Sequence, residues 1–318
     1  MPTWGQLLQE LKKGQEETKQ PPFDAVRRKY LSELSTHTKR NTILYATKWT
    51  QAAGVGPEDL SINEEDVQGL MEVIFEMKTK ELDLILHSPG GSPEATEAVV
   101  SYLRSKFNDI RVIIPHAAMS AATMLACAAN RIVMSKHSFL GPIDPQFILQ
   151  TPLGIQAVPA QAILDQFKRA QEECKDPKAL SSWLPILSQY GPALLVQCDN
   201  AIELSQQLVA AWLKKYMFAG QASEPAAKIA ADLSRHGMYK SHGRHISIEE
   251  AKNLGLVVDA LEVDHSFQER VLSVFHAAMH TFAATPAVKI IENNLGRAYI
   301  KMQQRILIPK QPQAPPST

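Results

Sequence analysis

The strongest constraint on the fold is the alternation of short apolar runs with helical patterns in the first half of the chain. The apolar runs cover residues 82–87, 111–115 and 132–134, and helical patterns over about 93–106 and 117–129 separate them. Short apolar strands that alternate with helices are typical of βαβ units around a mostly parallel sheet. The sequence therefore predicts an α/β fold.

The segments that flank this region divide the chain into four parts. Residues 1–38 have the pattern of an amphipathic helical arm, and residues 266–303 that of a C-terminal helical extension. Between them, residues 39–265 form the predicted α/β domain, with a long helical section from about 159 to 236. Residues 304–318 are rich in Pro and Gln, and we expect them to be disordered.

Composition excludes several classes of protein. Lysine plus arginine and aspartate plus glutamate each number 33, so the net charge is +0, without the basic excess usual in nucleic-acid-binding proteins. The three cysteines are far apart and lack metal-ligand spacing, which favours reduced thiols in a reducing compartment.

The N-terminus has a charged helical pattern without the apolar core of a signal peptide. The apolar stretch 112–134 contains proline, histidine, asparagine and arginine, and fits a buried strand and helix better than a membrane span. We expect a soluble, cytoplasmic protein with no integral membrane segment.

A glycine turn between a strand and a helix is the first candidate for chemistry. It reads Ser88-Pro89-Gly90-Gly91. Two glycines let the backbone turn tightly and direct free N–H groups at an incoming oxygen. With a helix behind it, such a turn can stabilise an oxyanion or bind phosphate. Glycines used only for steric reasons explain the turn equally well.

A serine at the next strand-to-helix junction is the second candidate. Ser120 lies in the run Ala117-Ala118-Met119-Ser120-Ala121-Ala122, among small residues that allow a substrate backbone to approach. This arrangement has the chemical logic of a nucleophile elbow, although the G-x-S-x-G pattern is absent. The simpler reading is that Ser120 caps the following helix. If the two strands are neighbours, however, Ser120 faces an oxyanion pocket built from the N–H groups of Gly91 and Ala121.

Both segments, followed by the run 131–146 that includes Gly141-Pro142-Ile143-Asp144, resemble the Clp-protease-like serine peptidases. The similarity is greatest to the serine dehydrogenase proteinase family, with signal peptide peptidase A-type enzymes as more distant relatives, and it extends from residue 23 to about 258. It implies a Clp protease/crotonase-like spiral of ββα units with helical arms at both ends and residues 39–265 as the catalytic domain. It also implies that Ser120 is the nucleophile and that Gly90, Gly91 and Ala121 form the oxyanion hole.

The resemblance further implies the order Ser, Asp, His for the catalytic residues. Asp144 fits the acid, and His242 matches the position of the histidine and is preferred to His245. A lysine base, as in the signal peptide peptidase relatives, stays an alternative, as does another histidine. These candidates are Lys136, Lys168, Lys175, Lys178, His87, His116 and His137.

The sequence thus predicts a serine-type endopeptidase that hydrolyses peptides or unfolded protein segments. No cofactor or metal site is expected, and the predicted partners are the substrate and further copies of the chain. Two alternatives remain open: a crotonase-type acyl-CoA enzyme, which usually depends on glutamates in the pocket, and a non-catalytic assembly or binding member of the fold.

Overall fold

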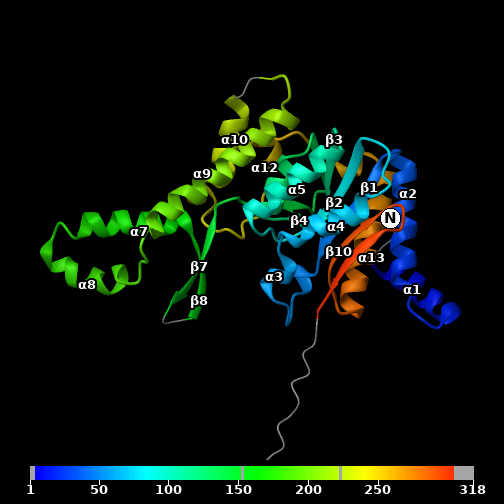
Figure 1. The fold of residues 1–318 in the computed structure, drawn as a ribbon, viewed down its shortest axis with the longest axis horizontal. Coiled ribbons are helices and arrows are strands. Elements are labelled where there is room, and N and C mark those ends of the chain that lie inside the picture. Colours follow the sequence, from blue (N-terminus) through cyan, green and yellow to red (C-terminus); the bar gives the residue numbers. More distant parts are fainter. Residues whose placement is uncertain (1–3, 152–153, 222–223, 304–318) are drawn as a thin grey trace, which may run out of the picture.

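A seven-stranded mixed sheet forms the centre of the computed structural model, which describes residues 4–151, 154–221 and 224–303 (Figure 1). The strand order is β11-β10-β1-β2-β3-β5-β9; β1, β2, β3, β5 and β9 run parallel, and β10 and β11 are antiparallel to their neighbours. The strands of this sheet are β1 (Asn41–Thr47), β2 (Glu81–His87), β3 (Asp109–Ile114), β5 (Arg131–Met134), β9 (Val258–Ala260), β10 (Ala287–Asn293) and β11 (Ala298–Met302). The prediction of an α/β fold is confirmed.

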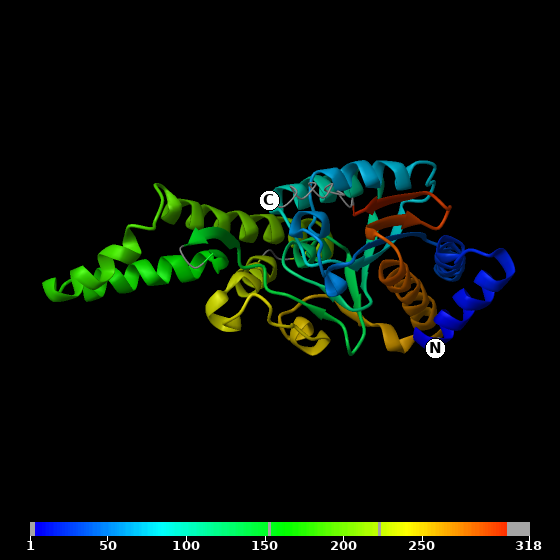
Figure 2. The same cartoon turned by 90° about the horizontal axis from the view of Figure 1, so that it is seen from below.

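Helices cover both faces of the sheet, and Figure 2 shows the sheet between the two layers. Successive strand residues point to opposite faces, so Leu84 and Val112 join the larger core with α4, α5 and α6, whereas Ile85 and Ile113 pack against α2 and α13. Helix α1 lies on the outside of α2 and α13. The helices of these layers are α1 (Trp4–Thr18), α2 (Phe23–Thr38), α4 (Glu65–Ile74), α5 (Pro93–Lys106), α6 (Ala121–Cys127) and α13 (His265–Ala284), and the short α3 (Pro57–Leu60) precedes α4.

Local sequence explains the ends of α5. Ser92 is the N-cap, and its hydroxyl oxygen accepts a hydrogen bond from Ala95 N–H. Pro93 follows as the first helical residue, where its fixed φ favours a helix start. The predicted helix over 93–106 is therefore confirmed, and its start is fixed directly behind the glycine turn.

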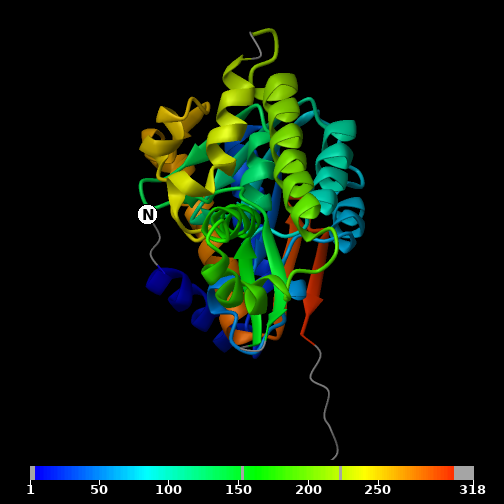
Figure 3. The same cartoon turned by 90° about the vertical axis from the view of Figure 1, so that its left-hand side faces the viewer.

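An arm projects from the body of the molecule (Figure 1), and Figure 3 looks along it. It contains a hairpin of β7 and β8, which sequence reasoning did not predict, and three of the helices expected between 159 and 236. Helix α9 leads back to the body, where Val209 and Trp212 join the larger core beside α10. The elements of this region are β7 (Gln146–Thr151), β8 (Gly154–Pro159), α7 (Ala160–Glu173), α8 (Pro177–Leu187), α9 (Leu194–Trp212) and α10 (Glu224–Ser234).

The C-terminal segment differs from the expected helical extension over 266–303. Only its first part is helical, in α13, and the chain then forms strands β10 and β11. Every residue of β10 is buried, because this strand lies between β1 and β11 inside the sheet. This segment is therefore part of the core. The expected disordered tail, residues 304–318, lies outside the described residues.

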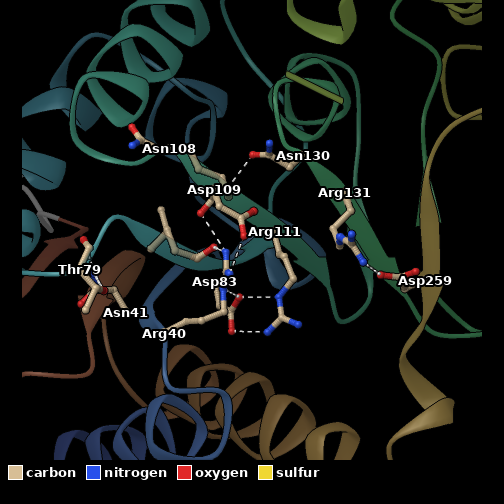
Figure 4. A network of polar contacts seen from close by, with 12 residues as sticks. Arg40, Asn41, Thr79, Asp83, Asn108, Asp109, Arg111, Asn130, Arg131 and Asp259 are labelled. Carbon is tan, nitrogen blue, oxygen red and sulfur yellow. Dashed lines mark hydrogen bonds and ion pairs between the residues drawn. The ribbon is translucent and has the colours of Figure 1, made fainter. Parts of the chain in front are cut away.

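Charged side chains tie the N-terminal ends of the parallel strands together (Figure 4). The buried carboxylate of Asp83 on β2 accepts hydrogen bonds from Arg40 Nε at 2.8 Å and from Arg111 Nε and Nη2 at 2.7 Å. Arg40 Nη1 also donates to Asp109 on β3 at 2.8 Å. These groups satisfy one another, so this edge of the sheet is a structural network. The candidate site lies at the opposite edge, where β2 and β3 end.

No helix within the described ranges is both long enough and apolar enough to cross a bilayer.

Candidate active site

Ser120 occupies a strained turn between the short strand β4 (Ala117–Ala118) and α6. Its φ of 52° and ψ of −121° are rare for a non-glycine residue and cost about 1–3 kcal/mol. Its side chain makes no capping hydrogen bond to α6, which argues against the simple capping role. A serine on a sharp strand-to-helix turn, with Oγ free, has the geometry of a nucleophile elbow.

The glycine turn lies directly against this elbow. Met119 N–H donates to the Ser88 carbonyl at 3.0 Å, and Ser88 N–H donates to the Ala117 carbonyl at 3.2 Å. Gly90 has a φ of +102°, and a Cβ there would lie 2.8 Å from Ser120 Cβ and 2.9 Å from Ala121 N. Glycine is therefore required at position 90 by both its conformation and its close approach to the elbow.

Two backbone N–H groups beside Ser120 have no acceptor within the described part of the chain. Ala121 is the first residue of α6, and its N–H lacks an intrahelical partner. Gly91 N–H also donates to nothing, whereas Gly90 N–H donates to Ser88 Oγ at 3.2 Å. The arrangement can bind an oxyanion through Gly91 and Ala121. Gly90 supplies the close packing that brings these two groups together.

A buried ion pair holds the segment that is hydrogen-bonded to the glycine turn. Ile62 N–H donates to the Gly90 carbonyl at 2.7 Å, and Ser92 N–H donates to the Ile62 carbonyl at 3.1 Å. The carbonyl of the preceding residue, Ser61, accepts a hydrogen bond from Lys289 Nζ at 2.8 Å. Lys289 also contacts Asp66 at 2.6 Å, with both side chains 1% exposed. Burial lowers the pKa of Lys289, although the Asp66 carboxylate acts in the opposite direction.

The carboxylate of Asp144 contacts two histidines. Its Oδ1 is 2.8 Å from His242 Nδ1, and its Oδ2 is 2.8 Å from His236 Nδ1 and 3.1 Å from Gln146 Nε2. An ionised carboxylate only accepts hydrogen bonds, so both rings donate from Nδ1 and keep Nε2 for another partner. The structure thus brings the predicted pair Asp144 and His242 into contact. It adds His236 and Gln146, which sequence reasoning missed.

Backbone pairing explains why these distant segments meet. Leu140 and Ile246 exchange two hydrogen bonds, at 3.0 Å and 2.9 Å. Ile143 N–H donates to the Leu233 carbonyl at 3.0 Å. The segment that precedes Asp144 is therefore fixed beside both residues 233 and 246. The chain between residues 233 and 246 contacts the Asp144 carboxylate through His236 and His242. It includes the short helix α11 (His236–Tyr239) and ends before α12 (Ile248–Asn253).

Ser120 and His242 line the same cavity, which has a volume of about 460 Å³ and also includes Gly91 and Ala121. Its lining includes the apolar residues Met124, Ile143, Phe147, Ile148, Ala201 and Leu204. Among the described residues Ser120 and His242 make no hydrogen bond, and such contacts are often long in free enzymes. The candidate nucleophile, the two candidate oxyanion donors and the histidine bound to Asp144 therefore line one cavity.

The other candidate bases do not line this cavity. His245 stacks on Phe139 with 3.6 Å between ring centroids, and His137 Nε2 lies 3.0 Å from the Pro115 carbonyl. His87 and His116 contact each other and Phe275 of α13. Lys136, Lys168, Lys175 and Lys178 are likewise absent from the cavity wall.

The buried His87 gives folding a pH dependence. Burial, helped by the neighbouring His116, lowers the pKa of His87 from 6.5 to about 3. Between these values the unfolded chain binds a proton that the folded chain excludes, so this group lowers stability as the pH falls, by about 1.4 kcal/mol per pH unit. We expect His87→Phe to lose less stability than wild type between pH 7 and pH 5 in urea unfolding. The matched control is His265→Phe, because the His265 side chain is 73% exposed. Identical pH slopes for wild type and His87→Phe would contradict the prediction.

Comparison with known proteins identifies the family. Residues 22–293 match the family described as ClpP-like SDH-type serine proteinase, so the chain belongs to this family. Two uncharacterised proteins of Methanocaldococcus jannaschii are similar in sequence. One is 32% identical over 239 residues, which are 73% of this chain and 73% of the relative. The other is 29% identical over 211 residues, 66% of this chain and 61% of the relative.

Two solved structures of proteases also match, at 15% sequence identity each. One is a membrane-bound stomatin-specific protease, with a TM-score of 0.37 over 63% of this chain and 75% of that protein. The other is ClpP1 from Listeria monocytogenes, with a TM-score of 0.36 over 71% of this chain and 94% of that protein. Family membership, rather than these structural matches, supports the expected class of serine peptidases.

Proposed function

We propose that the protein is a serine-type endopeptidase with Ser120 as nucleophile, His242 as general base and Asp144 as the residue that orients the base. One observation carries the proposal. The strained Ser120, the N–H groups of Gly91 and Ala121, which have no acceptor among the described residues, and the Asp144-bound His242 all line one cavity. Membership in a serine proteinase family supports this chemistry over that of an acyl-CoA enzyme.

The geometry supports an acyl-transfer mechanism. His242 Nε2 accepts the proton of Ser120 as Oγ attacks the scissile carbonyl carbon, and Asp144 stabilises the resulting imidazolium through Nδ1–H. The N–H groups of Gly91 and Ala121 bind the oxyanion of the tetrahedral intermediate. His242 then gives its proton to the leaving amine. In deacylation His242 takes a proton from water as the water attacks the acyl-enzyme carbonyl carbon, and it returns this proton to Ser120 Oγ as the ester bond breaks.

The substrate and setting are part of the proposal. The cavity, whose lining includes several apolar side chains, suits an extended peptide or an unfolded segment with apolar side chains. As the sequence predicts, we place the enzyme in the cytoplasm as a homo-oligomer that needs no metal or cofactor.

Covalent labelling tests the proposal directly. A fluorophosphonate probe is expected to modify wild-type protein at one residue, and peptide mass spectrometry should locate the adduct on Ser120. Ser120→Ala should stay unlabelled, and the control Ser181→Ala, on helix α8 of the arm, should label like wild type. Wild-type protein that takes up no probe and cleaves neither casein nor fluorogenic peptides would refute the peptidase proposal and favour a binding role.

A further inference from the structure

A second histidine contacts the carboxylate that orients the proposed base. His236 Nδ1 lies 2.8 Å from Asp144 Oδ2, the same distance that separates His242 Nδ1 from Oδ1. The Asp144 side chain is 3% exposed, and those of His236 and His242 are 17% and 27% exposed. A serine–histidine–aspartate mechanism uses only one of these rings, so the other requires its own explanation.

The two rings differ in what they can reach. His242 lines the cavity that contains Ser120, and His236 does not. His236 begins the short helix α11, and its ring contacts Oδ2 of Asp144, the carboxylate oxygen that His242 does not contact. Proton transfer from Ser120 therefore falls to His242, and His236 can influence the reaction only through Asp144.

The hydrogen bonds of Asp144 show what His236 contributes. Oδ1 accepts from His242, and Oδ2 accepts from His236 and, at the longer distance of 3.1 Å, from Gln146. No lysine or arginine forms an ion pair with Asp144 among the described residues. A buried carboxylate depends on such donors for both its charge and its orientation. Without His236, Gln146 is the remaining donor to Oδ2, and the carboxylate can rotate away from the plane that aligns His242.

We propose that His236 is a positioning residue, whose Nδ1–H fixes the Asp144 carboxylate so that its other oxygen orients His242 toward Ser120. This inference rests on the proposed peptidase function and deepens it. The active constellation then has four members, in which one carboxylate is held between two imidazoles and only one of these faces the substrate.

The test compares two substitutions of His236 in the full chain. His236→Ala removes the donor, and we expect kcat for a fluorogenic peptide to fall by about 10- to 100-fold, the size of effect that a small misplacement of a catalytic group produces. KM should stay within about twofold, because His236 does not reach the cavity. His236→Asn keeps an N–H donor close to the position of Nδ1 and should restore kcat to within about threefold of wild type.

A second His–Asp contact provides the matched control. His37 Nε2 lies 3.1 Å from Asp264 Oδ2, on the face of the sheet covered by α13, so His37→Ala also removes such a contact but should leave kcat and KM unchanged. Thermal unfolding of each variant separates loss of activity from loss of folding. A ring N–H spectrum of protein labelled with ¹⁵N-histidine adds a readout without turnover, since His236→Ala should remove one protected Nδ1–H signal and shift that of His242.

The outcomes separate the two proposals. Inert wild-type protein that the serine-directed probe does not label overturns the peptidase function, and this inference with it. Active wild-type protein with an unaffected His236→Ala variant overturns the inference alone. If both His236 variants are as inactive as Ser120→Ala while still folded, His236 takes part in proton transfer and is not a positioning residue.

Discussion

Replacing Ser120, His242 or Asp144 by alanine is expected to lower kcat/KM for a fluorogenic peptide by at least about 10³-fold in each case. In the proposed mechanism the three side chains act as one unit: Ser120 is a poor nucleophile without His242, and His242 is misaligned without the Asp144 carboxylate. The double and triple variants should therefore be little slower than Ser120→Ala. The residual rate should reflect the oxyanion donors Gly91 and Ala121, which these substitutions leave in place.

Steady-state kinetics of the single and combined variants measure this non-additivity. His265→Ala is the control for a histidine outside the site, because its side chain is 73% exposed. Additive losses, in which the triple variant is slower than wild type by the product of the three single-variant factors, would contradict a common mechanism. Loss of activity in Ser120→Ala alone would keep the nucleophile and assign the base to another residue.

Gly90→Ala is expected to have the second largest effect, a loss of about 10²-fold or more in kcat/KM together with lower stability. The new Cβ would lie 2.7 Å from the Met119 carbonyl oxygen, 2.8 Å from Ser120 Cβ and 2.9 Å from Ala121 N. Since backbone atoms cannot yield as a flexible side chain does, the elbow or the glycine turn must shift. A shift of about 1 Å at a catalytic group is sufficient for a 10²-fold loss.

Gly154→Ala separates this contact from backbone strain. Gly154 has a φ of +110°, close to the +102° of Gly90, but a Cβ there meets nothing within 4 Å. Both variants carry the conformational cost of alanine at positive φ, about 1 kcal/mol or more. Only Gly90→Ala should lose activity as well. Urea unfolding and kinetics of the pair measure the two effects, and equal kcat/KM for both variants would show that the close approach to the elbow is unimportant.

Sequence reasoning anticipated the part of the site that depends on local structure. The glycine turn and the serine at the next strand-to-helix junction follow from strand endings, and β2 and β3 are indeed neighbours in the sheet. The helical pattern over 93–106 also predicted the bounds of α5. The family resemblance supplied Asp144 and His242, which no local pattern connects because they are 98 residues apart.

The features that were missed depend on contacts between distant segments. His236 begins the short helix α11 and has no local pattern that marks it as a site residue. Only the contacts of residue 140 with 246 and of residue 143 with 233 bring its segment to Asp144. The second half of the C-terminal extension was expected to be helical, because β10 is buried on both faces and lacks the alternating pattern of a half-exposed strand. Without that alternation, periodicity does not distinguish a short strand from part of a helix.

The position of Lys289 has a consequence for the order in which the site is completed. Lys289 belongs to β10, and its hydrogen bond to the Ser61 carbonyl holds the segment that frames the glycine turn. During synthesis this lysine leaves the ribosome after Ser120, Asp144 and His242, so a nascent chain that already contains all three still lacks the hydrogen bond that holds the segment beside the glycine turn. Docking of β10 beside β1 thus links completion of the candidate site to completion of the sheet.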